Sequence, residues 1–310
     1  SLYYNQISGT IPASIGSLTK LTFLALYANS LSGQIPTSIS SLKNINTLDL
    51  SFNLLNESIP AGLGSFTSLT SLVLFNNQIP GSIPSDLGGL TQLQNLDLSN
   101  NQLQSMPTVL SGLRRLTYLK LTNNLLTGPM PSAIGSLTSL ATLYVSYNQL
   151  TGSIPSSIGL LTGLTDLDLR ANNFTAIPPS ITLLTNIYAL DLTSNLMSTP
   201  IPKELGSMVG LTKLDLSSNQ IPDTIPSTLG KLTQLQYLSL AYNQLSGTIP
   251  SSIGNLTGLT YLNLIANKLS GSIPPSVSLL QNINALDLSY NQLSGPIPKE
   301  IGSMVALYKL

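Results

Sequence analysis

Six aspartates occupy one position of a repeated Leu-Asp-Leu motif, and their carboxylates are the strongest candidates for chemistry in this sequence. They are Asp49, Asp97, Asp168, Asp191, Asp215 and Asp287. In a strand, this alternation places the leucines inward and the aspartate outward. Asp168, Asp191 and Asp215 belong to consecutive motifs, so their carboxylates would lie about 4.8 Å apart on neighbouring strands. At that distance stacked carboxylates could share a proton or hold Ca²⁺.

A structural role accounts for the same aspartates, because nearby hydroxyls and the basic side chains of Arg170 and Lys213 can bond to them. The composition favours this interpretation. The chain has no His and no Cys, so the commonest general base and metal ligand is missing, as is a thiol nucleophile. We therefore predict no catalytic residue, no metal site and no cofactor, and expect a protein that is not an enzyme.

The charge balance and the hydropathy exclude two further classes of partner. Twelve basic residues balance twelve acidic ones, and charged residues make up only 8% of the 310 residues, against roughly a quarter in soluble proteins. Such a chain has no field that attracts nucleic acid. No apolar run approaches the ~18 residues of a membrane-spanning helix. We therefore expect neither nucleic-acid binding nor a membrane span.

An internal repeat covers the whole chain. Residues 21–44 illustrate it, with the form LxxLxLxxNxLxGxIPxxIxxLxx and a length of 24 residues. An Ile-Pro or Met-Pro pair recurs in all thirteen units, and two of the spacings between units are 23 residues. The asparagine recurs in every unit, at Asn5, Asn29, Asn53, Asn77, Asn101, Asn124, Asn148, Asn172, Asn195, Asn219, Asn243, Asn267 and Asn291.

This pattern resembles the plant-type leucine-rich repeat, in which the Ile-Pro after the Asn-Leu-Gly turn is distinctive. The resemblance implies an α/β repeat solenoid of about 13 repeats, a right-handed superhelix with a parallel sheet on its concave side and short helical segments on the other. It also implies an extracellular location. Members such as receptor-like kinase ectodomains and polygalacturonase-inhibiting proteins usually carry caps with paired cysteines, which this chain lacks.

We interpret the asparagines as a structural ladder. Each lies where the chain turns out of the strand, and its amide can donate and accept toward backbone groups of its own and adjacent repeats. Leaving such a group buried and unpaired costs about 1–3 kcal/mol. A glycine occupies the following turn in eight units, whereas Glu57, Thr199 and Asp223 stand there elsewhere. We therefore expect that a positive φ is not obligatory at that turn.

Aromatic residues in the strand segments are the best candidates for binding. Tyrosine offers rigid, amphipathic contact area for a protein, peptide or carbohydrate ligand on the concave face. Aromatic residues also favour strands for structural reasons alone, so both explanations stay open. The candidates are Tyr3, Tyr4, Phe23, Tyr27, Phe52, Phe75, Tyr237, Tyr242, Tyr261 and Tyr290. If the two chain ends met, these residues would form one band.

Three Asn-x-Ser/Thr sequons occur, at Asn56, Asn173 and Asn255. All three lie at polar positions for which we expect exposure. If the protein is secreted, glycans at these positions would help to keep a weakly charged surface soluble.

The chain ends lead to a functional hypothesis. Residues 1–310 read as a single array without caps, and joining residue 310 to residue 1 gives an Asn291-to-Asn5 spacing of 24 residues, the standard value. A solenoid that continues in register, by head-to-tail contact or covalently, would form a fibre. Our first reading is therefore an extracellular structural scaffold whose main partner is itself.

Two alternatives remain open. One is the ligand-binding segment of a receptor-like or inhibitor-like ectodomain, because the resemblance implies members that hold peptides, small hormones or proteins on the concave or lateral face. The other uses the Ser/Thr-rich convex side, with IPSSIG at Ile154 and Ile249, as a regular surface for ice or carbohydrate.

Overall fold

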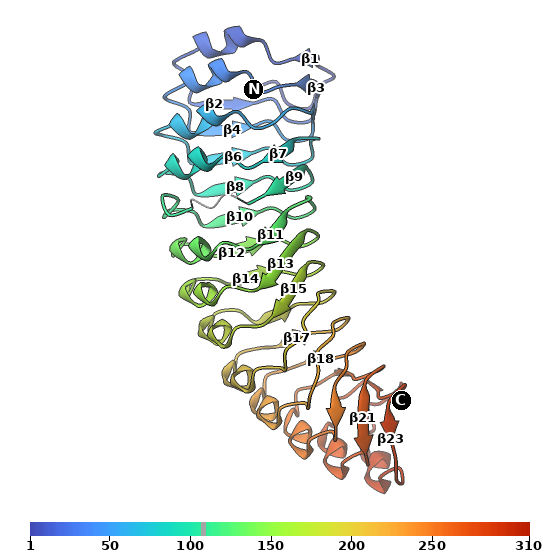
Figure 1. Ribbon diagram of the computed structural model, residues 1–310. Coiled ribbons are helices and arrows are strands. Elements are labelled where there is room, and N and C mark those ends of the chain that lie inside the picture. Colours follow the sequence, from blue (N-terminus) through green and yellow to red (C-terminus); the bar gives the residue numbers. More distant parts are fainter. Residues whose placement is uncertain (107–109) are drawn as a thin grey trace. The chain divides into compact units, whose positions relative to one another are not determined.

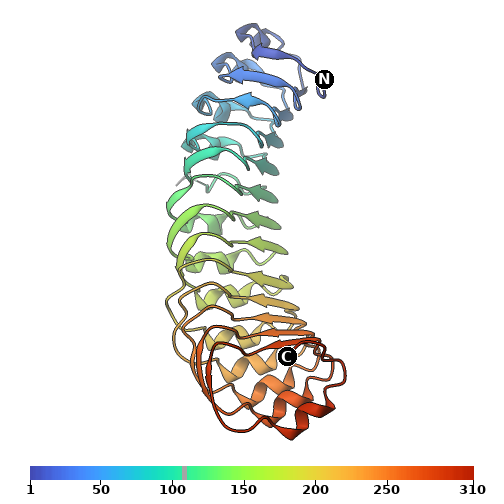
Figure 2. The ribbon, with the colours of Figure 1, turned by 90° about the vertical axis from the view of Figure 1, so that its right-hand side faces the viewer.

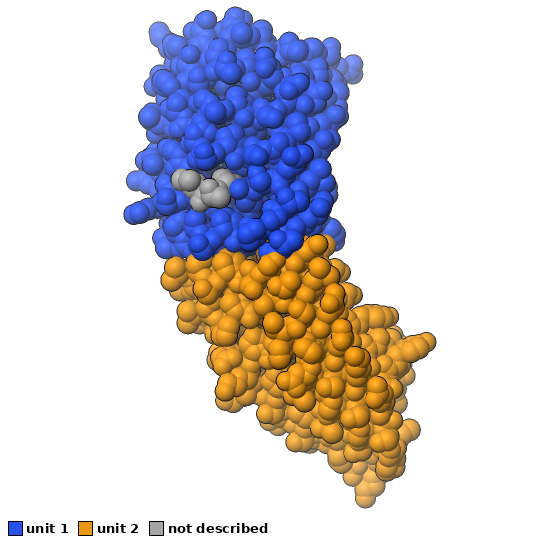
Figure 3. Space-filling model, viewed as in Figure 1, with its two compact units in different colours: residues 1–151 blue, residues 152–310 orange. Residues whose placement is uncertain are grey.

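The computed structural model describes residues 1–106 and 110–310, which form two compact units, residues 1–151 and residues 152–310 (Figure 3). Each unit repeats one rung: a short strand, a turn, a second extended segment and a 3₁₀-helix (Figure 1). The Met106-Pro107 pair of the repeat falls partly outside the described residues.

Unit 1 contains a parallel sheet with one strand per rung. Its strands, in spatial and chain order, are β2 (Phe23–Ala25), β4 (Thr47–Asp49), β6 (Ser71–Val73), β8 (Asn95–Asp97), β10 (Tyr118–Lys120) and β12 (Thr142–Tyr144). The second extended segments pair as β1 (Ser8–Thr10), β3 (Ser30–Gly33) and β5 (Leu54–Leu55), and as β7 (Pro80–Ser82), β9 (Gln102–Ser105), β11 (Thr127–Pro129) and β13 (Gln149–Ser153). The helices are η1 (Ala13–Ser17), η2 (Thr37–Ser41), η3 (Ala61–Ser65), η4 (Ser85–Gly89) and η5 (Ser132–Ser136).

Unit 2 repeats this arrangement. Its sheet strands are β14 (Asp166–Asp168), β16 (Ala189–Asp191), β17 (Lys213–Asp215), β18 (Tyr237–Ser239), β20 (Tyr261–Asn263) and β22 (Ala285–Asp287). The second segments include β15 (Asn173–Ala176), β19 (Ser246–Gly247), β21 (Lys268–Gly271) and β23 (Gln292–Leu293). The helices are η6 (Ser156–Leu160), η7 (Pro179–Leu183), η8 (Lys203–Ser207), η9 (Ser227–Lys231), η10 (Ser251–Asn255), η11 (Pro275–Leu279) and η12 (Lys299–Ser303).

The register between rungs follows the repeat. Leu214 of β17 pairs with Leu238 of β18, which pairs with Leu262 of β20, and Figure 2 shows such strands running side by side. These three leucines are at most 1% exposed. Because one rung cannot enclose its apolar side chains, the stacked neighbours bury them as a column.

Proline starts the helices. Pro36, for example, has φ −66° and ψ 137° and precedes η2, and its carbonyl accepts a hydrogen bond from the N–H of Ile39 at 2.9 Å. Proline is compatible with this position because it fixes φ and its missing N–H would have no partner there. The Ile-Pro pair therefore marks where each rung leaves its extended segment and enters a helix.

The residue before each ladder asparagine has left-handed backbone, which the repeat pattern did not predict. Its φ is 50–56° at Tyr4, Ala28, Phe52, Asn76, Asn100, Asn123, Tyr147, Ala171, Ser194, Ser218, Tyr242, Ala266 and Tyr290. At the later glycine turn, the expectation that positive φ is not obligatory holds for Glu57 and Thr199 but is wrong for Asp223, whose φ is 69°. Aspartate tolerates this conformation because its short side chain can bond locally.

Candidate functional site

The sheet face of each unit is formed by the strand residues that alternate with the buried leucines. In β17, Lys213 and Asp215 flank Leu214, which is 0% exposed. Successive rungs therefore present their variable residues in parallel columns, and any ligand on this face meets side chains from several rungs.

Each aspartate of the column accepts hydrogen bonds from the residue two positions further along the chain. Asp215 Oδ1 accepts from the N–H of Ser217 at 3.0 Å and from its hydroxyl, and the same two-residue pattern recurs at Asp49, Asp97, Asp191 and Asp287. Asp168 instead binds the Arg170 guanidinium through both oxygens, at 2.9 and 3.0 Å.

The three aspartates on consecutive rungs act separately. Asp168 lies opposite Asp191, and Asp191 opposite Asp215, but Lys213 Nζ bonds Asp191 Oδ2 at 2.8 Å. Burial opposes ionisation of Asp191, yet the bonds from Lys213 and Thr193 outweigh it and hold the pKa of Asp191 below its ordinary value. Each carboxylate is therefore held by its own donors. Within the described part of the chain, no group of three or more acidic, His or Cys residues could hold a metal ion.

An aromatic pair lies next to these charges in unit 2. The rings of Tyr237 and Tyr261 stack with centroids 4.6 Å apart and planes 9° apart. Lys213 Nζ lies 5.4 Å from the centre of the Tyr237 ring, within cation–π range. The Tyr237 hydroxyl donates to Asp215 Oδ2 at 3.2 Å. Burial, and then the Asp215 carboxylate, raises the pKa of Tyr237 well above its ordinary value, so the Tyr237 hydroxyl keeps its proton for this hydrogen bond.

The aromatic candidates of unit 1 form two separate groups. Tyr3 stacks on Tyr27 at 4.6 Å, and Tyr4 meets the edge of Tyr27 at 5.3 Å. Phe52 and Phe75 meet edge to face at 4.8 Å. Phe23 is exposed on β2. The sequence reading missed a further pair, Tyr118 and Tyr144, whose rings lie 6.4 Å apart; their positions on neighbouring strands are the signal that could have found it.

Four candidates stand where the backbone is left-handed. Strict alternation would turn Tyr4, Phe52, Tyr242 and Tyr290 toward the core, because each follows an outward position. Their positive φ turns the side chains out instead, and they are 49–81% exposed. Tyr242 and Tyr290 therefore border the sheet at its exit turn, apart from the stacked pair Tyr237 and Tyr261.

A ladder asparagine between two rungs bonds to both of them, as Asn243 shows. Asn243 Oδ1 accepts from the N–H of Ile221 at 3.0 Å, and its Nδ2 donates to the carbonyls of Leu216 at 2.9 Å and Leu240 at 3.1 Å. The same set of bonds recurs at Asn53 in unit 1. Because Asn243 is only 9% exposed, it pairs backbone groups that water cannot reach.

The three sequon asparagines are all exposed. Asn56 follows β5 and accepts from the N–H of Gly33 at 3.1 Å, Asn173 begins β15, and Asn255 ends η10. An oligosaccharide could reach all three positions. Among the residues that the structure describes, no helix is long and apolar enough to cross a membrane.

The stacked rungs, the parallel sheet and the asparagine ladder define a solenoid of leucine-rich repeats, and the chain belongs to the leucine-rich repeat family. Family models described as leucine rich repeat match residues 84–126, 116–174 and 162–221, and residues 44–66, 68–90, 234–256, 258–280 and 282–304. The fold expected from the sequence is thereby confirmed. A comparison with curated protein sequences found no significant match.

Solved plant receptor structures are similar to this chain. The plant peptide hormone receptor RGFR1, in complex with RGF2, is 36% identical with a TM-score of 0.88, over 99% of this chain and 53% of that chain. The ectodomain of GASSHO1/SCHENGEN3 from Arabidopsis thaliana, in complex with CASPARIAN STRIP INTEGRITY FACTOR 2, is 36% identical with a TM-score of 0.79, over 99% and 40%. The Arabidopsis HAESA ectodomain, in complex with an IDA peptide hormone, is 30% identical with a TM-score of 0.70, over 100% and 65%.

The chain thus spans about half of the first of these relatives and 40% of the second. These similarities favour the ligand-binding alternative. They give no support to the fibre-forming scaffold or to a homopolymer as the main partner.

Proposed function

We propose that this chain is the ligand-binding segment of an extracellular leucine-rich-repeat receptor and that it holds an extended peptide on the sheet face of unit 2, the concave face expected from the resemblance. The role is recognition without catalysis. Support comes from the similarity to ectodomains solved with peptide hormones. Exposure of the three sequon asparagines agrees with a secreted, glycosylated protein.

The stacked Tyr237 and Tyr261 pair carries this proposal. Two rings held 4.6 Å apart offer a broad contact surface that loses little conformational entropy on binding. Hydrogen bonds fix both rings, since Tyr237 donates to Asp215 and Tyr261 accepts from Asn263 Nδ2 at 3.1 Å. Aromatic anchors of this kind dominate the energetics of protein interfaces.

The surrounding charges would orient the peptide. Lys213 lies between Asp191, which it bonds, and the ring of Tyr237, and Asp168 with Arg170 continues the charged pattern two rungs away. Mixed charges beside an aromatic anchor favour a peptide that has both an apolar residue and charged neighbours. The main chain of an extended peptide would cross several rungs, because rungs are ~4.8 Å apart.

Selection from a displayed random-peptide library tests this function. We expect the chain to enrich peptides that contain an aromatic or proline residue next to a charged one. The Tyr237→Ala/Tyr261→Ala double variant should bind a selected peptide at least tenfold more weakly, about 1.4 kcal/mol. Tyr188→Ala is the control, because Tyr188 is also exposed but lies outside the pair. Equal binding by the double variant, or a library that yields no binder, would refute the proposal.

A further inference from the structure

A second site lies where the chain passes from the 3₁₀-helices of unit 2 to its sheet. One position per rung there alternates between small residues and carboxamides. In chain order these are Gly163, Asn186, Gly210, Gln234, Gly258, Asn282 and Ala306. A small residue between two amide-bearing rungs leaves space between their side chains.

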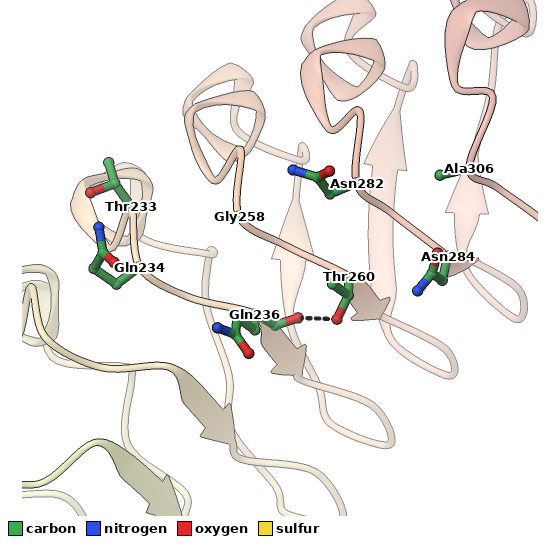
Figure 4. Close-up of a pocket in the computed structure, with 8 residues that line it drawn as sticks. All are labelled: Thr233, Gln234, Gln236, Gly258, Thr260, Asn282, Asn284 and Ala306. Carbon is green, nitrogen blue, oxygen red and sulfur yellow. Dashed lines mark hydrogen bonds between the residues drawn. The ribbon is translucent and has the colours of Figure 1, made fainter.

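The space over Gly258 is a hollow of about 550 Å³. Figure 4 shows Gln234 on one side of Gly258 and Asn282 on the other, with Gln236, Thr260 and Asn284 along the edge nearest the sheet. Thr233 and Ala306 complete the lining. Of the described residues, the eight that line this hollow include no charged and no aromatic side chain, so its chemistry is that of amides and hydroxyls.

Several of these polar groups have free bonding capacity. The Thr260 hydroxyl donates to the Gln236 backbone carbonyl at 2.9 Å, which leaves its oxygen as an acceptor. Asn282 Nδ2 donates to the Thr257 carbonyl at 2.9 Å, which leaves its Oδ1 free to accept a further bond. Gln236 and Asn284 are exposed, and their side-chain amides have no hydrogen-bond partner within the part of the chain that the structure describes.

The corresponding row of unit 1 provides an internal contrast. There the sequence places Lys20, Asn44, Ser68, Gln92, Arg115 and Ser139 at this position. Arg115 Nη1 donates to Gln92 Oε1 at 2.6 Å. In unit 1 a guanidinium thus binds the carboxamide of Gln92, whereas no cation among the described residues binds the corresponding carboxamides of Gln234 and Asn282 in unit 2. Lys20 and Arg115 therefore make this row cationic in unit 1, whereas the row from Gly163 to Ala306 carries no charge.

We propose that this hollow binds a neutral oligosaccharide. A carboxamide presents two donors and an acceptor, which matches vicinal sugar hydroxyls that also donate and accept. Because the amides recur on every second rung and rungs are ~4.8 Å apart, successive amides are roughly 10 Å apart, about the length of two hexopyranose residues in an extended glycan. An anionic polysaccharide would require a cation in the lining, which the hollow lacks. The lining also contains no large apolar or aromatic side chain to hold the side chain of a peptide.

Calorimetric titration with cellohexaose, xylohexaose and mannohexaose tests the proposal, and hexagalacturonate and a selected sheet-face peptide serve as comparison ligands. We expect at least one neutral hexasaccharide to bind with a Kd at or below about 1 mM and hexagalacturonate not to bind. Gln236→Ala/Asn284→Ala should weaken the sugar at least fivefold and leave the peptide unaffected. Gln102→Ala, which removes an exposed carboxamide from unit 1, should change neither.

Two glycine-to-glutamine variants, one that fills the hollow and one outside it, form a matched pair. Gly258→Gln would occupy the hollow, with a close Cβ contact of 3.3 Å to the Thr233 carbonyl oxygen. Gly210→Gln adds the same side chain between Asn186 and Gln234, at a position where a Cβ meets nothing within 4 Å and which does not line the hollow. We expect at least a tenfold loss of sugar binding in the first variant only. Failure of every neutral hexasaccharide to bind would overturn the proposal. So would equal binding by both glycine variants, or an effect of the amide variants on the peptide alone.

Discussion

The asparagine ladder makes a quantitative prediction for Asn243→Ala. The substitution removes the acceptor of the Ile221 N–H, and Ile221 is 0% exposed, so this donor is left buried without a partner at about 1–3 kcal/mol. It also removes the 2.9 Å bond to the Leu216 carbonyl. That carbonyl keeps a second bond, from Asn219 Nδ2 at 3.1 Å. The substitution therefore costs the Leu216 carbonyl one ordinary hydrogen bond, roughly 0.5–1.5 kcal/mol of stability.

The other carbonyl partners of Asn243 remain satisfied. The Leu240 carbonyl keeps the Asn267 amide at 2.9 Å, and the Ala241 carbonyl keeps the N–H of Ser218 at 2.9 Å. The expected destabilisation is therefore about 1.5–4.5 kcal/mol, the sum of one orphaned donor and one lost bond. Equilibrium unfolding in urea measures it, with the midpoint and slope fitted separately because long repeat arrays can lose two-state behaviour.

Asn5→Ala is the matched control, because the Asn5 amide donates only to carbonyls of its own rung, those of Leu2 and Tyr3, in an exposed setting. We expect this variant to stay within about 0.5 kcal/mol of the parent chain. Asn243→Asp should be as destabilising as Asn243→Ala at neutral pH, since its carboxylate would face carbonyl oxygens. If Asn243→Ala is no more destabilising than Asn5→Ala, the two-rung bonding argument is wrong.

Three further predictions concern stability. Tyr242→Val should lower it by roughly 1–2 kcal/mol, and Tyr242→Asn should preserve or raise it, because φ is 54° there and β-branched residues tolerate this conformation poorly; urea midpoints that rank the variants the other way would contradict this. Lys213→Met should lower stability at neutral pH, and the stability difference from the parent chain should shrink below about pH 4. Because the pKa of Asp191 is lowered in the folded chain, the stabilisation by its ion pair is complete above the unfolded-state pKa and is lost as pH falls through the folded-state pKa. Melting temperatures measured across this range test it, and a pH-independent gap would count against it. Gly206→Ala should cost roughly 1–3 kcal/mol because a Cβ would lie 2.2 Å from a backbone carbonyl of the next rung, whereas Gly210→Ala meets nothing within 4 Å; similar unfolding midpoints for these two variants would refute the packing argument.

Much of the rung could be predicted because its residues have few alternatives. The Leu-x-Leu alternation predicts strand and core, the proline predicts the helix start, and the asparagine predicts a turn that needs both a donor and an acceptor. The proximity of Tyr237 and Tyr261 could also be predicted, since residues 24 positions apart on neighbouring rungs lie opposite each other.

The left-handed backbone before each asparagine could not be predicted from the sequence, because Tyr, Ala, Phe, Asn and Ser all occur at that position. No residue type marks that conformation; the closure of the rung imposes it. The exposure of Tyr242 and Tyr290 therefore has a physical cause that strand alternation cannot supply.

Polar side chains that already make internal hydrogen bonds differ in their binding potential from those that make none. Asp215 has its donors from Ser217 and Tyr237, so a ligand cation would have to compete with bonds already made, and the aspartate column is a poor binding site despite its regularity. The Gln236 and Asn284 amides face a hollow with their bonding capacity unused, so a ligand there would gain bonds without breaking internal ones. In a repeat that places every polar residue in a column, unused capacity identifies a binding site better than the residue pattern does.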